Sequence, residues 1–255
     1  QIGFGLIDSS LDSSKMHGML LIKEQGARVL TLIADDINTN GWLNVNKLNI
    51  TDYEKLRQVE ADIGFLKLID IDSVENKKFD INLIKALHTH IFEDIYSWAG
   101  EFRTVPIIKE ELVLPGCSID YSSVSMIEKD LNGLLDDLNN TKWNYEDRKE
   151  IAYTFARKMA LIWRVHPFRD GNTRTILSFS YMFAKEHNFP FDIEIFAKKL
   201  NRSYDNGKLN DTSIRDRFVL ACLDDKDYPE VKYLASTFYT AMGQYNSVEQ
   251  TKNTK

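Results

Sequence analysis

A polar stretch of ten residues, HPFRDGNTRT at positions 166–175, separates two long segments whose apolar residues recur at helical spacing. The residue before a proline is disfavoured in the helical region, so we expect His166 to end the first helix ahead of Pro167. Asp170 and Gly171 form a turn pair that should lead directly into the second helix. The chain must therefore turn sharply between two core helices and carry its polar residues at the joint.

Helical periodicity continues through most of the chain. Thr51 is expected to cap the first clear helix, with Glu54 completing a capping box three residues later. In the helix before the joint, apolar residues at three- and four-residue spacing predict one buried face. These residues are Ile151, Phe155, Met159 and Ile162. The expected helices cover about 52–72, 83–97, 123–138, 145–165, 172–188, 191–202, 211–223 and 228–243.

One segment departs from this pattern. WAGEFRTVPIIKEELVLPG, residues 98–116, has β-branched residues on either side of a polar centre and ends in Pro115-Gly116. Such a segment predicts a short β-hairpin. The expected fold class is therefore all-α, with one short hairpin between helices.

Charge and composition exclude several classes of protein. A formal net charge of −6 gives no general attraction for nucleic acid or an anionic membrane. No apolar run approaches the roughly 20 residues of a membrane-spanning helix, and the first residues lack the pattern of a secretory signal. Cys117 and Cys222 lie far apart without CxxC spacing, as is usual in a reducing compartment. We therefore expect a cytoplasmic protein that binds neither nucleic acid nor membrane.

The joint has the features of an anion site. The first N–H groups of a helix have no partner inside it, and the helix dipole makes that end positive. Gly171 has no side chain to block close approach, and the guanidinium of Arg174 can bind two phosphate oxygens. The sequence therefore predicts a phosphate site at the start of the second helix.

Two neighbouring residues add chemistry to this site. Asp170 suits a Mg²⁺ ion that arrives with a polyphosphate, because Mg²⁺ takes one or two carboxylates besides phosphate oxygens and waters. His166, with an ordinary pKa of about 6.5, can take a proton from an attacking hydroxyl near neutral pH. A purely structural interpretation stays open at this point, since His at a helix end, Asp-Gly in a turn and Asn172 as a cap are each common.

The same residues resemble a known motif. HPFRDGNTR is similar to the Fic (Fido) motif HxFx(D/E)GNxRxxR, and the matching residues are His166, Phe168, Asp170, Gly171, Asn172 and Arg174. HIFEDIYSWAGEFRTVPIIK, residues 90–109, resembles the family's segment that leads into the target-docking hairpin called the flap. The likeness covers about residues 47–225, which leaves 1–46 as an N-terminal extension and 226–255 as a C-terminal helix with a loose tail.

The resemblance implies a Fic-like helical domain and an enzyme that attaches AMP from ATP to a Ser, Thr or Tyr hydroxyl of a target protein. His166 would be the general base, Asp170 the Mg²⁺ ligand and Phe168 a buried anchor. The implied nucleotide-binding residues are Gly171, Asn172, Thr173, Arg174 and Lys109. The target would dock on the hairpin at residues 103–113, where Arg103 and Lys109 would hold target or nucleotide; the alternative is that both are solvated edge charges.

The chain departs from the motif at its last position, where the second arginine of the family is replaced by Leu177. That arginine usually contacts the γ-phosphate of ATP, and loss of a charged hydrogen bond costs about 1.5–3 kcal/mol. Two alternatives therefore stay open. One is a Doc-like phosphotransferase, although Doc-like proteins carry a bulkier residue at the position of Gly171. The other is a catalytically weak module that binds nucleotide or protein.

The family's inhibitory motif, (S/T)xxxE(G/N), has no convincing match. TLIADD at residues 31–36 has Asp in place of Glu, and SWAGEF at 97–102 lies in the hairpin segment without the following Gly or Asn. We expect no self-inhibition of the usual type, and a separate antitoxin chain stays open as a partner.

Two other features were considered as sites. His88 and His90 are two residues apart on a helix, so their side chains point about 200° apart and should not share a metal ion. The loop at residues 201–211 either closes over the adenine or is a polar connection with an Asn-Gly turn.

Overall fold

A computed structural model gives the fold of the chain. The described residues are 46–75, 78–109, 111, 113–114, 118–192, 200–201, 211–223 and 231–243. The predicted loose tail and nearly all of the predicted N-terminal extension lie outside this set, as does most of the loop at 201–211.

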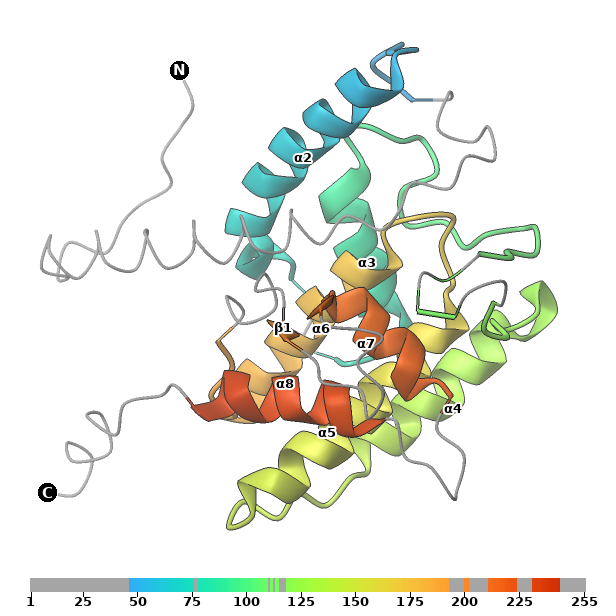
Figure 1. Ribbon diagram of the computed structural model, residues 1–255. Coiled ribbons are helices and arrows are strands. Elements are labelled where there is room, and N and C mark those ends of the chain that lie inside the picture. The colour runs from blue at the N-terminus through green and yellow to red at the C-terminus, as the bar shows by residue number, and fades with distance from the viewer. Residues whose placement is uncertain are drawn as a thin grey trace, which may run out of the picture.

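Within the described residues the chain is helical except for one pair of two-residue strands, so the predicted all-α class is confirmed. The elements are α2 (Tyr53–Ile69), η2 (Ile71–Ser73), α3 (Ile81–Phe92), η3 (Val124–Met126), α4 (Ile127–Asn139), α5 (Arg148–Val165), α6 (Asn172–Glu186), β1 (Leu200–Asn201), β2 (Asp211–Thr212), α7 (Ile214–Ala221) and α8 (Val231–Gly243). Figure 1 shows α2 at one end of the molecule, α5 and α8 toward the other, and α3 and α6 between them.

Helix α5 is the centre of the core. Helix α8 packs along it, α4, α6 and α7 also contact it, and α3 packs along α6. The predicted stripe is buried as expected, with Phe155, Met159 and Ile162 fully enclosed. The ring of Phe155 lies 5.5 Å from that of Phe183 and 5.3 Å from that of Phe238, which ties α5 to α6 and α8. Burial of each of these side chains stabilises the fold by about 1.5–3 kcal/mol. The joint between α5 and α6 is therefore attached to two helices that are packed into the core.

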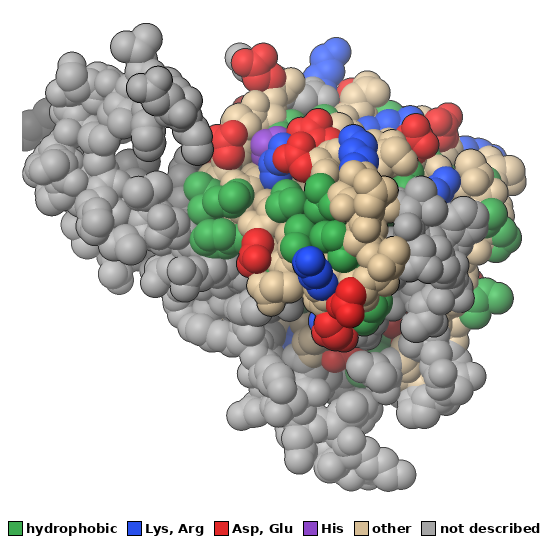
Figure 2. Space-filling view, turned by 90° about the horizontal axis from the view of Figure 1, so that it is seen from above, with side chains coloured by type: hydrophobic (Ala, Val, Ile, Leu, Met, Phe, Trp, Pro, Cys, Tyr) green, Lys and Arg blue, Asp and Glu red, His purple; other side chains and the backbone are tan. Residues whose placement is uncertain are grey.

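The surface carries charges of both signs. Figure 2 shows acidic and basic side chains intermixed with apolar ones on the face seen from above, with neither sign dominating it. Across the described parts of the chain, the helices lack the combination of length and apolar character needed to cross a bilayer.

Three predicted helix boundaries are wrong. Asp52, not Thr51, caps α2, because its carboxylate accepts the Lys55 N–H at 2.7 Å. Helix α3 ends at Phe92 instead of near residue 97, and turns follow as far as Gly100.

The helix expected at 191–202 is also wrong at its end. Leu200 pairs with Thr212, and Asn201 with Asp211, as antiparallel strands. The backbone groups at both positions therefore bond across the loop instead of along a helix, and residues 193–199 lie outside the described set.

The segment predicted as a hairpin forms no strand among its described residues. Its backbone bonds elsewhere, since Arg103 donates its N–H to the Pro167 carbonyl at 2.8 Å. The start of the segment is thus attached to the joint between α5 and α6, and the described residues of the segment show no strand ladder of the kind on which the prediction relied.

Candidate active site

The loop between α5 and α6, residues 166–171 (the motif loop), begins in a strained conformation. His166 follows α5 with φ 50° and ψ 58°, in the left-handed region. Pro167 excludes the right-handed helical region for the residue before it, and a left-handed non-glycine residue costs roughly 1–2 kcal/mol. The carbonyl of His166 accepts a hydrogen bond from Nε of Arg103 at 2.8 Å, which helps to hold this conformation. Local sequence and a distant arginine therefore fix the backbone of His166 together.

The end of the motif loop requires glycine. Gly171 has φ 73°, and a Cβ atom at this position would lie 2.3 Å from Cε2 of the buried Phe92 ring. The loop is then closed by Asn172, whose Oδ1 accepts the Phe168 N–H at 2.9 Å and whose Nδ2 donates to the Phe168 carbonyl at 3.0 Å. Asn172 thus uses its side chain to hold the loop, and its contribution to a phosphate site comes from its place at the start of α6.

The side chains of Thr173 and Arg174 are also engaged within the protein. Thr173 accepts a hydrogen bond from Nε1 of Trp163 at 2.9 Å. The guanidinium of Arg174 lies 2.5 Å from the carboxylate of Glu60 and 4.5 Å from the centre of the Phe92 ring. The side chains of these two residues are therefore directed into the protein, which leaves backbone groups at the N-terminus of α6 as the candidates for the predicted phosphate site.

Glu60 is a site residue that sequence reasoning missed. It is 3% exposed, and its other oxygen accepts the Tyr96 hydroxyl at 2.6 Å. Burial, followed by the charge of Glu60, raises the pKa of Tyr96. A signal was present in the sequence, because Glu60 falls at four-residue spacing between Leu56 and Gly64 on the buried face of α2. A carboxylate in that stripe requires a buried cation as its partner.

His88 contacts two residues of the motif loop. The Gly100 N–H donates to Nδ1 of His88 at 2.9 Å, so Nε2 carries the ring proton and donates to the Asp170 carbonyl at 3.0 Å. The ring also stacks on Phe168 at 3.8 Å. His90 turns to a different neighbour, the Lys67 carbonyl, at 2.8 Å. The role of His88 is thus to hold Phe168 and Asp170, which its position in the sequence did not suggest.

The side chain of His166 is fully buried. Neither ring nitrogen has a hydrogen-bond partner among the described residues. Burial lowers the pKa of His166 well below its usual value, and the positive charges of Lys109, Arg215 and Arg103 lower it further, against the opposing effect of the Trp163 backbone. The imidazole is therefore neutral at pH 7 and can accept a proton.

The interpretation of Arg103 and Lys109 as solvated edge charges is wrong. Arg103 is 2% exposed, and its side chain donates to the carbonyls of His166 (2.8 Å), Val105 (3.1 Å), Val165 (3.5 Å) and Ser122. Lys109 is 7% exposed, and its ammonium has no hydrogen-bond partner among the described residues. Arg103 is therefore a structural anchor of the motif loop. Lys109 is a buried positive charge that lowers the pKa of His166.

Asp170 is the one carboxylate of the motif loop. It is 5% exposed, and its Oδ1 accepts the Gly171 N–H at 2.7 Å. Within the described residues no group of three or more His, Cys, Asp or Glu side chains could hold a metal ion. A single carboxylate at a helix start fits a Mg²⁺ ion that takes its other ligands from phosphate oxygens and waters, and does not fit a metal held by protein ligands alone.

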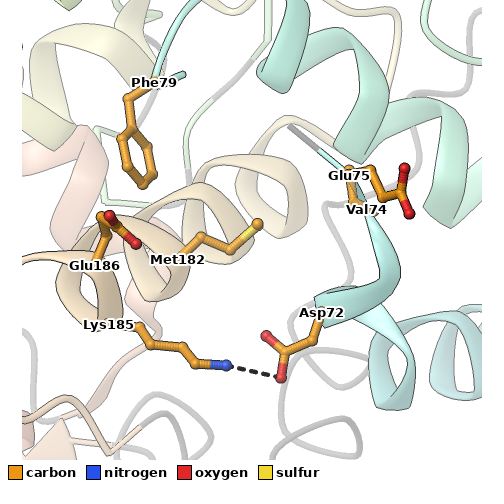
Figure 3. A pocket seen from close by; sticks show the side chains of 7 residues that line it. All are labelled: Asp72, Val74, Glu75, Phe79, Met182, Lys185 and Glu186. Atoms are coloured by element: carbon orange, nitrogen blue, oxygen red, sulfur yellow. Dashed lines mark ion pairs between the residues drawn. The ribbon is translucent and has the colours of Figure 1, made fainter. Parts of the chain in front are cut away.

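A cavity of about 690 Å³ lies at the other end of α6 (Figure 3). It is lined by Asp72, Val74, Glu75, Phe79, Met182, Lys185 and Glu186, with an ion pair of 3.0 Å between Lys185 and Asp72. Met182 is ten residues beyond Asn172, which is roughly 15 Å along the helix. None of the predicted site residues lines this cavity, so it is separate from the motif loop.

Comparison with known proteins agrees with this geometry. Residues 78–184 match the Fic/DOC family. The chain is 28% identical over 154 residues to protein adenylyltransferase VbhT of Bartonella schoenbuchensis, covering 58% of this chain and 30% of VbhT. It is 30% identical over 151 residues to the probable protein adenylyltransferase y4lH of Sinorhizobium fredii, covering 58% of this chain and 73% of y4lH. The chain thus spans less than a third of VbhT.

A solved structure shows the same fold. The crystal structure of BepC from Bartonella tribocorum with bound AMPPNP superposes with a TM-score of 0.56 at 19% identity, covering 77% of this chain and 90% of BepC. The arrangement of helices around the motif loop is therefore shared by chains of very different sequence.

Proposed function

Because the chain belongs to the Fic/DOC family, we propose that it transfers AMP from ATP to a Ser, Thr or Tyr hydroxyl group of a target protein. The names of its relatives VbhT and y4lH describe protein adenylyltransferases, and BepC binds the ATP analogue AMPPNP. One observation carries the proposal: a neutral imidazole without a hydrogen-bond partner among the described residues lies in the loop that opens onto the N-terminus of α6.

His166 is the general base in this proposal. Its ring takes the proton of the target hydroxyl as that oxygen forms a bond to the α-phosphorus. The bond between the α-phosphorus and the oxygen that bridges to the β-phosphate breaks, and pyrophosphate leaves. A neutral imidazole is needed at the start of this step, and the burial and positive charges around His166 keep it neutral.

The start of α6 holds the phosphates. Its first N–H groups and the positive end of the helix dipole attract negative charge, and Gly171 lets the loop that leads into them pack against the buried Phe92 ring. Asp170 would hold the Mg²⁺ ion, which neutralises phosphate charge when bound. The charge of Arg174 is balanced by Glu60, so Arg174 acts mainly by holding the first turn of α6 against α2. At the position of the second arginine of the motif, Leu177 is fully buried, so we expect weaker contact to the γ-phosphate.

The target protein docks on residues 103–113. Ile108 is 80% exposed and is the most exposed large apolar side chain among the described residues, while the adjacent Lys109 turns inward. An exposed apolar side chain in this segment suits a protein surface as partner. We propose a cytoplasmic setting, in which ATP and Mg²⁺ are present, and a separate antitoxin chain as the regulator.

Labelling with ATP tests this proposal. Candidate targets or a cell extract are incubated with the full chain, Mg²⁺ and ATP carrying the label on either the α- or the γ-phosphate. Label from the α-position on protein supports AMP transfer. Label from the γ-position only would identify a phosphotransferase, and no protein label with measurable ATP binding would identify a binding module.

Two histidine variants make the test specific. His166→Ala should abolish transfer while AMPPNP binding, measured by calorimetry, stays within about threefold. His187→Ala removes the half-buried histidine at the C-terminal end of α6 and should leave transfer unchanged. Transfer by His166→Ala at the original rate would refute the assignment of the base.

A further inference from the structure

The general base of the proposed reaction is enclosed by the protein. His166 has no exposed surface. The ring of Tyr121 lies 4.3 Å from the imidazole, and the ring of Trp163 lies 5.0 Å from it. A hydroxyl group on a folded target cannot reach a ring that is enclosed in this way, so some of these neighbours must move during turnover.

Among these neighbours, Tyr121 belongs to a part of the chain without regular structure. We call the described residues between 101 and 122 the covering segment; none of them forms a helix or strand. Trp163, in contrast, is part of α5 and donates to Thr173 at the start of α6. The covering segment is therefore the part that can move, and its position depends on side-chain contacts.

Among the side-chain contacts that attach the covering segment to the core, two involve buried charges, and they differ in the groups that they use. Near its start, Arg103 donates to the backbone carbonyls of Val165 and His166, at the end of α5. Further along, Glu111 is 3% exposed and faces Nη2 of Arg215, at 2.9 Å from Oε1 and 2.8 Å from Oε2. The first attachment uses several backbone groups, and the second depends on one ion pair.

Glu111 also determines where Tyr121 lies. The Tyr121 hydroxyl donates to Oε1 of Glu111 at 2.5 Å, while its ring covers His166. Arg215 is in the first turn of α7, which packs against α5 and α8. The rigid helices thus hold Glu111 through Arg215, and Glu111 holds Tyr121 over the base.

We propose that Glu111, Tyr121 and Arg215 form a latch that keeps the covering segment closed over His166, and that the base becomes accessible when this latch opens. Arg103 stays attached and acts as the fixed end of the movement. That a target protein reaches His166 through this opening rests on the proposed function. The opening of the latch does not depend on that function.

The latch is tested by chemical modification of histidine in the full chain. Diethyl pyrocarbonate reacts with neutral, accessible imidazoles, and mass spectrometry of peptides measures the rate at each histidine. In Glu111→Gln we expect the rate at His166 to rise about tenfold, since the lost interaction is a hydrogen-bonded ion pair. The rate at His187, in the same molecule, should not change.

Two further variants complete the test. Tyr121→Phe keeps the ring and loses only its hydrogen bond to Glu111, so we expect a rise at His166 of about threefold. Asp137→Asn removes an ion pair of 2.6 Å with Lys158 at the surface of α4 and α5 and should leave the rate at His166 unchanged.

The outcomes separate the latch from the chemistry of the site. If Glu111→Gln unfolds, seen as faster modification of His187 as well, Tyr121→Phe decides the question. No rise at His166 in a folded Glu111→Gln, or in Tyr121→Phe when it is the deciding variant, overturns the latch. Because neither ATP nor target is present, that result would leave AMP transfer untouched, and failure of AMP transfer would leave the latch standing.

Discussion

The motif loop and the covering segment both lack regular secondary structure, yet the motif loop is closed by contacts near it in the sequence, whereas the covering segment is held to the core by residues far along the chain. At the motif loop, Asn172 bonds to Phe168 four residues away, and the helices on either side of the loop are joined by Thr173 and Trp163, ten residues apart; only the supports of the loop, such as His88 on Asp170, come from a distance. In the covering segment, Arg103 reaches His166 across 63 residues, and Glu111 reaches Arg215 across 104.

This difference explains which region could be understood from the sequence. Caps, turns and a residue before proline act on their immediate neighbours, so the motif loop was predicted in outline. Buried charges in the covering segment are stabilised by partners that no local pattern identifies, so the segment looked like an exposed hairpin. The same difference predicts that substitutions in the covering segment will disturb the motif loop at a distance.

The largest effect is expected for Arg103→Met, which keeps the length of the side chain and removes its donors. Several backbone carbonyls, including those of Val105 and His166, lose their partner in a buried site. We expect a loss of about 4 kcal/mol in the free energy of unfolding, measured by urea denaturation. In the control Arg57→Met, at an exposed position of α2, the change should stay within about 0.5 kcal/mol. Equal losses in the two variants would mean that Arg103 is not an anchor.

The next effect concerns the motif loop itself. In Gly171→Ala the new Cβ meets the Phe92 ring at 2.3 Å, and the residue must adopt φ 73°. Overpacking and the left-handed conformation together should cost about 3 kcal/mol. Gly133→Ala is the matched control, because nothing lies within 4 Å of its Cβ and it stands inside α4; there we expect a gain of about 0.5–1 kcal/mol. Tolerance of Ala at both positions would show that the loop can relax.

The features that could be predicted from the sequence are again those that depend on residues close together in the chain. The helices and the buried stripe of α5 follow from periodicity, and Gly171 could be singled out because only a few residues suit a turn that opens a helix. Glu60 was missed because its partner Arg174 is 114 residues away. His88 was weighed only as a metal ligand, since nothing near it in the sequence indicates that Phe168 and Asp170 lie against it. The chemistry of the site could be anticipated, but not the residues that hold it in place.

A third prediction concerns the pKa of His166 in the motif loop, which the positive charges of Lys109 and Arg103 in the covering segment help to lower. The folded-state pKa of His166 is lowered, whereas the unfolded value is about 6.5. Below about pH 6.5 the unfolded chain therefore binds the extra proton, so stability falls as the pH decreases and is fully present above this range. The contribution of this one group should approach about 1.4 kcal/mol per pH unit.

The variant His166→Asn isolates this contribution, because Asn tolerates the left-handed backbone and the chain's four other histidines remain. Between pH 7.5 and 5.5, the free energy of unfolding of the original protein should fall relative to that of the variant as the pH decreases. Parallel curves would show that the surrounding charges do not keep His166 neutral in the folded state.

The smallest effect tests the limit of local prediction, at the start of α2. Thr51 and Asp52 are adjacent, and both can cap a helix, and the prediction of Thr51 as the cap was wrong. In the structure the Asp52 carboxylate accepts the Lys55 N–H at 2.7 Å. Asp52→Ala should therefore cost about 1 kcal/mol, and Thr51→Ala less than about 0.5 kcal/mol, in the free energy of unfolding. If Thr51→Ala proved the more damaging, the helix in solution would begin one residue earlier than the structure shows, and the Lys55 N–H would not be the group that the cap satisfies.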